Sequence, residues 1–262
     1  MNALQSSKVC DVTGVVSIAC ARHGCYAPNS LMDLFKGEQQ KNMDFSFLRA
    51  ITFTHVDPEQ GIVFYYDIIC QYIIYLQERI GTHLPFGLVA EAAIGLFHVH
   101  AHKDECFFWY ASTFISGAGV VASEILESFW SSLNSILPTV WTATFAHRAE
   151  MLDDHATDSN HKKMLGIILS LCKSNTTAID MFEHAQQYFN NLTAEAGTTA
   201  VNKWKDDIEA AERERHLNVK AMDIYAAKSN TDKQKNREPG TSPSGLALIS
   251  WMELSLAIEE KQ

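Results

Sequence analysis

Two carboxylates stand at positions where they could hold a divalent cation. Asp67 interrupts an apolar, β-branched and aromatic run, residues 62–69, which predicts a buried strand. A carboxylate in such a strand is costly unless it is hydrogen-bonded, paired or bound to a cation. Glu124 follows a turn at Gly117 and lies in the first turn of a predicted helix. An acid that ends a core strand and an acid that begins a later helix form a ligand set suited to Mg²⁺ or Mn²⁺.

Each acid also has a structural interpretation that needs no metal. Asp67 could cap the helix that follows it or pair with a buried arginine, and the helix dipole favours Glu124 behind an N-cap at Ser123. Glu127 lies one turn further along the same helical face, so it could replace Glu124 as the ligand or support it. As metal ligands, these acids would position cations that could activate an attacking oxygen for phosphodiester chemistry.

A second group of candidate ligands contains nitrogen and sulfur. His98, His102 and Cys106 are spaced at i, i+4 and i+8, so on a helix all three would share one face. These donors could hold a structural Zn²⁺ ion with a fourth ligand from elsewhere. The alternative is a set of partly buried, hydrogen-bonded histidines without a metal. His100 breaks the spacing and is predicted to face away.

The charge distribution limits what the chain can bind by itself. The 262 residues carry a net charge of −10. Residues 1–201 hold 11 Lys and Arg against 20 Asp and Glu, a net of −9, whereas residues 202–238 hold 9 against 8. An acidic body attracts divalent cations and repels a phosphate backbone. We therefore expect weak DNA binding by this chain alone.

Several classes of protein are disfavoured by what the sequence lacks. It has no Gly-x-Ser-x-Gly, P-loop or dinucleotide glycine pattern, which argues against nucleophilic hydrolysis and nucleotide binding. No apolar run is long enough to cross a bilayer, and the N-terminus lacks a signal-peptide core. The six cysteines are irregularly spaced, so we expect them to be mostly reduced in an intracellular protein.

Periodicity predicts strands and helices first, and then helices alone. We expect a strand over residues 9–20, a helix over residues 44–52 with Asp44 as its N-cap, and a helix over residues 72–80. Beyond Phe145 the apolar spacing predicts helices over residues 146–155, 162–173 (starting at Asp158-Ser-Asn160), 176–196 and 200–227. Residues 228–245 have the composition of a linker, and residues 246–260 form an amphipathic helix that could dock on a partner.

An ordered series of motifs between residues 9 and 165 resembles the Kyakuja–Dileera–Zisupton (KDZ) transposases. The motifs are Asp11-Val-Thr-Gly-Val-Val, Cys20-Ala-Arg22-His23-Gly, Lys36-Gly-Glu with Asn42-Met-Asp44, Tyr66-Asp67-Ile-Ile-Cys70-Gln71, His98-x-x-x-His102-x-x-x-Cys106, Gly117-Ala-Gly with Glu124, Glu127 and Trp130, and His147-Arg148 with Leu152-Asp153-Asp154-His155. One such motif is weak, but the ordered series is specific.

The resemblance implies an α/β (α+β) fold, with a partial RNase H-like core in residues 1–165 and a mostly helical C-terminal region. Residues 166–227 would be helical, followed by the linker at 228–245 and the amphipathic helix at 246–262. It also implies an Asp-Asp-Glu site in which Asp67 and Glu124 hold Mg²⁺ or Mn²⁺, and a nuclear location. The family has Asp-Gly just before this Glu, where the present chain has Ala122-Ser123. Arg22-His23 and His147-Arg148 would contact DNA phosphate or brace the fold.

The first acid of the implied triad has no match in the sequence. KDZ relatives carry it in an Asp-x-Asn-Phe context well before the Thr-Gly-Val-Val strand, whereas this sequence begins ten residues before Asp11. We therefore expect an N-terminally truncated, inactive copy. A domesticated interaction protein that binds a partner through residues 200–262 is the main alternative. A nuclease that uses Asp11 is a third.

Overall fold

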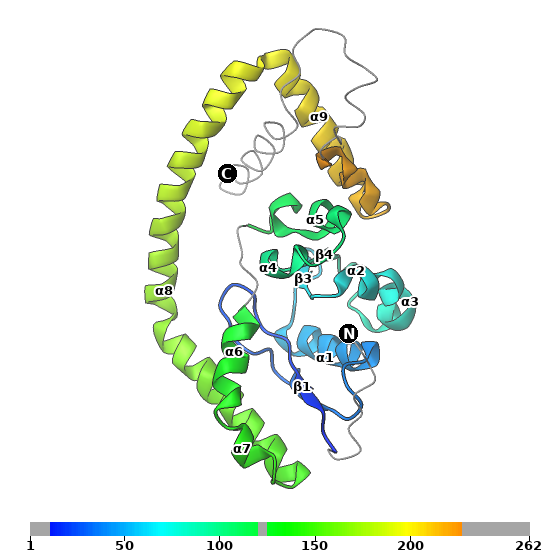
Figure 1. The fold of residues 1–262 in the computed structure, drawn as a ribbon, viewed down its shortest axis with the longest axis vertical. Helices are drawn as coiled ribbons and strands as arrows, with labels where there is room; N and C mark the ends of the chain where they lie inside the picture. The colour runs from blue at the N-terminus through cyan, green and yellow to red at the C-terminus, as the bar shows by residue number, and fades with distance from the viewer. Residues whose placement is uncertain (1–10, 120–124, 227–262) are drawn as a thin grey trace. The chain divides into compact units, whose positions relative to one another are not determined.

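The structure is a computed structural model that describes residues 11–119 and 125–226 (Figure 1). The chain divides into two compact units, Met1–Ala92 with Ala122–Ser170, and Ala93–Val121 with Leu171–Gln262. The fold is mixed α+β and mostly helical, with two small two-stranded sheets among the described residues. The coarse fold class is therefore as predicted. The predicted linker and final amphipathic helix lie outside the described residues.

The first unit begins with a short hairpin. Strands β1 (Gly14–Val16) and β2 (Met32–Leu34) pair in antiparallel register, with Val15 opposite Asp33. Within the described part of the predicted strand at 9–20, only Gly14–Val16 forms the ladder. Beyond it the backbone of Ile18 bonds to the buried Ser30 hydroxyl instead, which accepts from the Ile18 N–H at 3.1 Å.

Helix α1 (Gln40–Thr54) packs behind this hairpin, and it begins four residues before the predicted start. Asp44 is consequently an interior residue of the helix, and the prediction that it is the N-cap was wrong. Its side chain is directed into the core because the same helical face carries the buried residues Met43 and Phe47. Phe47 stacks on Phe64 with the ring centroids 4.3 Å apart.

The segment after α1 forms a strand and a series of short helices. Strand β3 (Ile62–Tyr65) shares a two-stranded sheet with β4 (Ala90–Ala93). The short helices between them are α2 (Ile69–Tyr72), η1 (Ile73–Tyr75), α3 (Leu76–Ile80) and η2 (Gly81–His83). The predicted helix at 72–80 is thus broken into shorter pieces, and Arg79 of α3 reaches back to Asp44 of α1.

Helices α6 (Ile125–Asn134), α7 (Leu137–Val140) and the long α8 (Phe145–Ala196) complete the described part of this unit, α8 continuing into the second (Figure 1). The helix α8 is continuous over 52 residues, where the sequence predicted three separate helices. Asn160, predicted as part of a helix start, lies inside α8. Its amide accepts from the Tyr26 N–H at 2.7 Å and donates to the Tyr26 carbonyl at 3.0 Å.

The second unit is helical around a small aromatic core. It contains α4 (Leu96–Val99), α5 (Asp104–Tyr110), η3 (Ser112–Phe114), α9 (Thr198–Arg215) and η4 (Val219–Tyr225). Phe114, Met222 and Tyr225 are almost completely buried in this core. The predicted helix at 200–227 therefore ends at Arg215, and η4 follows it. None of the described helices combines the length and the apolar character that a membrane span requires.

Candidate metal-binding residues

Asp67 lies in a turn rather than within a strand. Strand β3 ends at Tyr65, because the chain turns where the Ile69 N–H donates to the Tyr66 carbonyl at 3.0 Å. Asp67 is exposed in that turn, immediately before α2. The expectation of a carboxylate embedded in an apolar strand was therefore wrong, although the acid does follow a strand as predicted. An exposed carboxylate carries little desolvation cost and is accessible to a hydrated cation.

Acidic side chains act together on Tyr66, next to Asp67. The Tyr66 hydroxyl donates to Glu38 at 2.6 Å. Burial is the main reason that the pKa of Tyr66 is raised far above its ordinary value, followed by the hydrogen bond and charge of Glu38, with a smaller contribution from Asp67. This neighbourhood has the negative potential that would attract a divalent cation.

The second predicted acid, Glu124, lies outside the described residues. Within the described residues, helix α6 covers Ile125–Asn134. Glu127 belongs to α6, but its side chain is also outside what the structure describes. The convergence of Asp67 with either glutamate remains a prediction.

The histidine and cysteine group differs from the predicted one. Helix α4 ends at Val99 and α5 begins at Asp104, so His98, His102 and Cys106 do not lie along one helix. The interruption comes at His102 and Lys103, where Lys103 is extended (φ −66°, ψ 149°). The expectation of one shared helical face was wrong.

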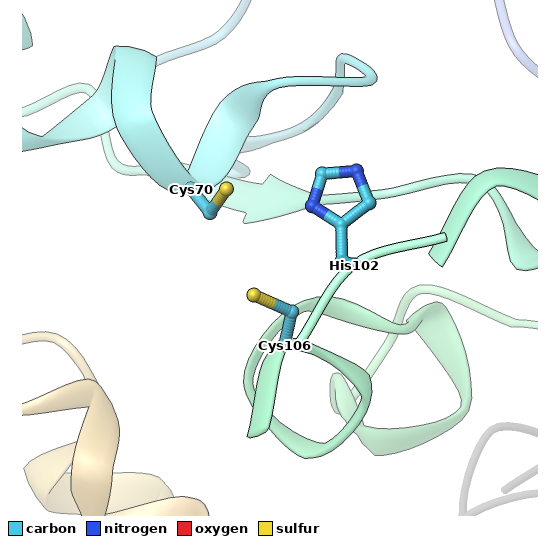
Figure 2. A group of neighbouring side chains, drawn as sticks. All are labelled: Cys70, His102 and Cys106. Atoms are coloured by element: carbon cyan, nitrogen blue, oxygen red, sulfur yellow. The ribbon is translucent and has the colours of Figure 1, made fainter. Parts of the chain in front are cut away.

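Cys70 of α2 joins His102 and Cys106 in a group that could hold a metal (Figure 2). The two sulfur atoms and an imidazole nitrogen all lie within 4.8 Å of one another. Two thiolates on one zinc ion would be about 3.8 Å apart, a separation that falls within this limit. Cys106 is buried, and the other two residues are half-buried. His98 is not part of this group.

Cys70 was not among the ligands predicted from the sequence, although it lies in the motif Tyr66-Asp67-Ile-Ile-Cys70-Gln71 that resembles the KDZ transposases. Two sulfur donors and one nitrogen donor are a soft set that suits zinc better than Mg²⁺. With three ligands from the described residues, a tetrahedral ion would have a fourth position for another ligand or water.

One of the polar motifs has a structural role that the sequence left open. Arg148 is buried in α8, and its Nε donates to Asp33 of β2 at 2.9 Å. This pair ties α8 to the hairpin, so Arg148 braces the fold. The neighbouring His147 is exposed and lies 3.7 Å from Glu150.

The comparison with protein families bears on the whole of this region. The family described as Kyakuja-Dileera-Zisupton transposase matches residues 1–160, more than half of the chain. The chain belongs to the KDZ transposase family. No curated protein and no solved structure matches it.

The KDZ match includes most of the features described above. It covers the hairpin, α1, the Asp67 turn, the Cys70, His102 and Cys106 group, and α6. It ends at Asn160, whose side-chain amide forms hydrogen bonds with the backbone N–H and carbonyl of Tyr26. The rest of α8, together with α9 and η4, lies beyond the matched residues.

Proposed function

We propose that the matched region is an RNase H-like KDZ catalytic core in which Asp67 and Glu124 hold Mg²⁺ or Mn²⁺ for cleavage and transfer of DNA strands. The family match over residues 1–160 is the observation that carries this proposal. The exposed position of Asp67 directly after β3 supports it. Such cations would activate the attacking oxygen and stabilise the leaving one. The carboxylates would fix their positions. The nucleus, where chromosomal DNA is found, is the location proposed with this function.

Asp67 and Glu124 would be two of the three acids that the KDZ resemblance implies. A missing bridging carboxylate would lower two-metal catalysis by orders of magnitude. With these two acids alone, we expect cation binding without DNA cleavage. Strand nicking by the chain that depends on Asp11 would instead support the nuclease hypothesis.

Asp67→Asn is expected to weaken Mn²⁺ binding at least tenfold, because the neutral amide removes one charged ligand. Isothermal titration of the unaltered chain and the variant with Mn²⁺ measures this. Asp57→Asn is the matched control, since Asp57 is an exposed aspartate whose carboxylate accepts only the Glu59 N–H in the described structure. Equal binding by both variants, or none by the unaltered chain, would remove Asp67 from the metal site.

The Cys70, His102 and Cys106 group is proposed to hold a structural Zn²⁺ ion. Its support is the donor set and the mutual distances, which lie within 4.8 Å. Ligand thiols bind zinc as thiolates, so loading releases protons and weakens as the pH falls. Bound zinc would stabilise the segments that carry its ligands without taking part in DNA chemistry.

Cys70→Ser and Cys106→Ser are each expected to reduce the zinc content of the purified protein from about one equivalent to nearly none. Metal analysis after dialysis measures the content, and thermal unfolding with and without a chelator reports the stability. Cys172→Ser is the control, because Cys172 is exposed on α8. An unaltered protein that binds no zinc, or loss of zinc only with Cys172→Ser, would contradict the assignment.

A protein-interaction role without catalysis is the second candidate function. It is favoured by the exposed apolar side chains of α8, because a solvent-exposed helix face is usually polar. In this case the acids would have only structural roles. Absence of any Mn²⁺ effect together with partner binding through the C-terminal helices would favour it.

A further inference from the structure

Helix α8 exposes large apolar side chains in its middle portion. Leu165, Ile168 and Leu169 are 75%, 72% and 78% exposed. Further exposed apolar residues in the same portion are Met164, Leu171, Ile179 and Met181. Exposed apolar patches of this kind on a protein surface commonly mark sites of interaction with another protein.

Three of these residues, Leu165, Ile168 and Ile179, fall into a spacing that matches a two-helix interface. Leu165, Ile168, Cys172, Asn175, Ile179 and Phe182, here called the α8 seam, alternate at intervals of three and four residues. That alternation places them along one stripe, as the core positions of a coiled coil require. The seam spans 18 residues, or about 27 Å of helix, counting from 165 to 182. Asn175 is a polar core residue of the type that fixes the register of such an interface.

We propose that two copies of this chain pair through their α8 seams in antiparallel orientation. The inference goes beyond the proposed function and does not depend on it. A two-fold axis between residues 173 and 174 would place Leu165 opposite Phe182, and Ile168 opposite Ile179. Cys172 would then lie opposite Asn175. The first of these layers pairs a larger with a smaller apolar side chain, the second pairs two isoleucines, and the third pairs a cysteine with a polar residue.

The charges beside the seam favour antiparallel over parallel pairing. Lys162 lies three residues before Leu165, and Glu183 lies one residue after Phe182. In the heptad repeat that the α8 seam follows, these two positions are equivalent and flank the core. In the antiparallel register they face each other across the interface, and symmetry makes two such pairs. In a parallel pair Lys162 would face Thr157 and Glu183 would face Ala178, so no ion pair would form.

The present contacts of Lys162 are compatible with this arrangement. Its Nζ lies 2.6 Å from Asp158 on the same helix, and both side chains are mostly exposed. An exposed pair of this kind contributes little, so Lys162 can bridge Asp158 and Glu183 of a second copy at small cost.

Sedimentation of the full chain over a range of concentrations tests the proposal. The unaltered chain is expected to form a dimer at micromolar concentrations. Ile168→Lys places two charges in the seam and is expected to weaken the dimer at least a hundredfold. Ile74→Lys is the matched control, because Ile74 is 63% exposed on η1 and far from α8 in the sequence. It should leave the dimer unchanged.

Charge reversal tests the orientation separately. Lys162→Glu and Glu183→Lys are each expected to weaken the dimer several-fold, and the double variant should return close to the original affinity. A chain that stays monomeric overturns the proposal and assigns the seam to another occupant, including residues 246–260 of the same chain. A dimer that is insensitive to Ile168→Lys also overturns it. Failure of the double variant to recover overturns the antiparallel register.

Discussion

Replacing Asp44 by alanine is expected to lower the free energy of unfolding by about 3–5 kcal/mol, because it leaves a charge partner and a buried hydroxyl unpaired. Asp44 is only 9% exposed. It accepts from the Tyr72 hydroxyl at 2.6 Å and from Arg79 Nε and Nη2 at 2.8 and 3.1 Å. Tyr72 is fully buried, and the Arg79 guanidinium also lies 4.6 Å from its ring centroid. Asp44 therefore holds α1 to α2 and α3.

Electrostatics agrees with that geometry. Burial raises the pKa of Tyr72 far above its ordinary value, and its hydrogen bond to Asp44 raises it further. The pKa of Arg79 is also raised, mainly by its hydrogen bonds to Asp44. The hydroxyl is protonated and the guanidinium charged at neutral pH even without these shifts, and the shifts favour the same states, which donate to Asp44.

Urea unfolding followed by circular dichroism measures the Asp44 effect. Tyr72→Phe removes one hydrogen bond and should cost about 1 kcal/mol. Asp158→Ala removes an exposed ion pair on α8 and should cost no more than about 0.5 kcal/mol. Arg79→Met combined with Asp44→Ala should cost less than the two single changes added together, because the double variant leaves no unpaired charge, although the Tyr72 hydroxyl still loses its acceptor. If Asp44→Ala costs no more than Asp158→Ala, the network does not stabilise this unit.

Local periodicity predicted much of the secondary structure, but not the contacts between distant residues. The helix at α1 and the helical region after Phe145 follow from apolar spacing, which depends only on neighbours in the chain. The role of Asp44 did not follow, because an Asp near a helix start is usually a cap. Here its partners lie 28 and 35 residues away, and those tertiary bonds prevail.

The continuity of α8 shows the same limit. Asp158-Ser-Asn160 has the composition of a helix start, since these side chains can bond to free N–H groups. The Asn160 amide instead satisfies both backbone groups of Tyr26, 134 residues away. A helix can continue through such residues when their side chains bond elsewhere.

The candidate sites divide in the same way. The motif that contains Asp67 and the motif that contains His102 and Cys106 can each be found in the sequence as a single stretch, although Asp67 was expected within a strand and lies in a turn. Cys70 joins that metal group only through folding, because it precedes His102 by 32 positions. His98 leaves the predicted group because the chain turns after Val99. A spacing of four residues places two ligands on one face only where the helix is continuous.

Replacing Arg215 by methionine is expected to cost about 2–4 kcal/mol of unfolding free energy in the second unit, because one buried and one partly buried carbonyl lose their donor. Arg215 ends α9 and is only 8% exposed. Its Nη1 donates to the Phe114 carbonyl at 2.9 Å, and its Nη2 donates to the Trp109 carbonyl at 2.5 Å. These carbonyls lie at η3 and α5, so one guanidinium joins three elements of the core.

Methionine fills a similar volume but donates no hydrogen bond, so the variant separates hydrogen bonding from packing. Arg215→Lys should recover only part of the loss, since one ammonium on a shorter stem lacks the planar fork that reaches both carbonyls. Arg213→Met is the matched control on the same helix. Arg213 is 72% exposed, and its Nη1 lies 3.8 Å from Glu209, so its replacement should change stability by no more than about 0.5 kcal/mol. Equal effects at the two positions would mean that the stability of this core comes from its apolar residues alone.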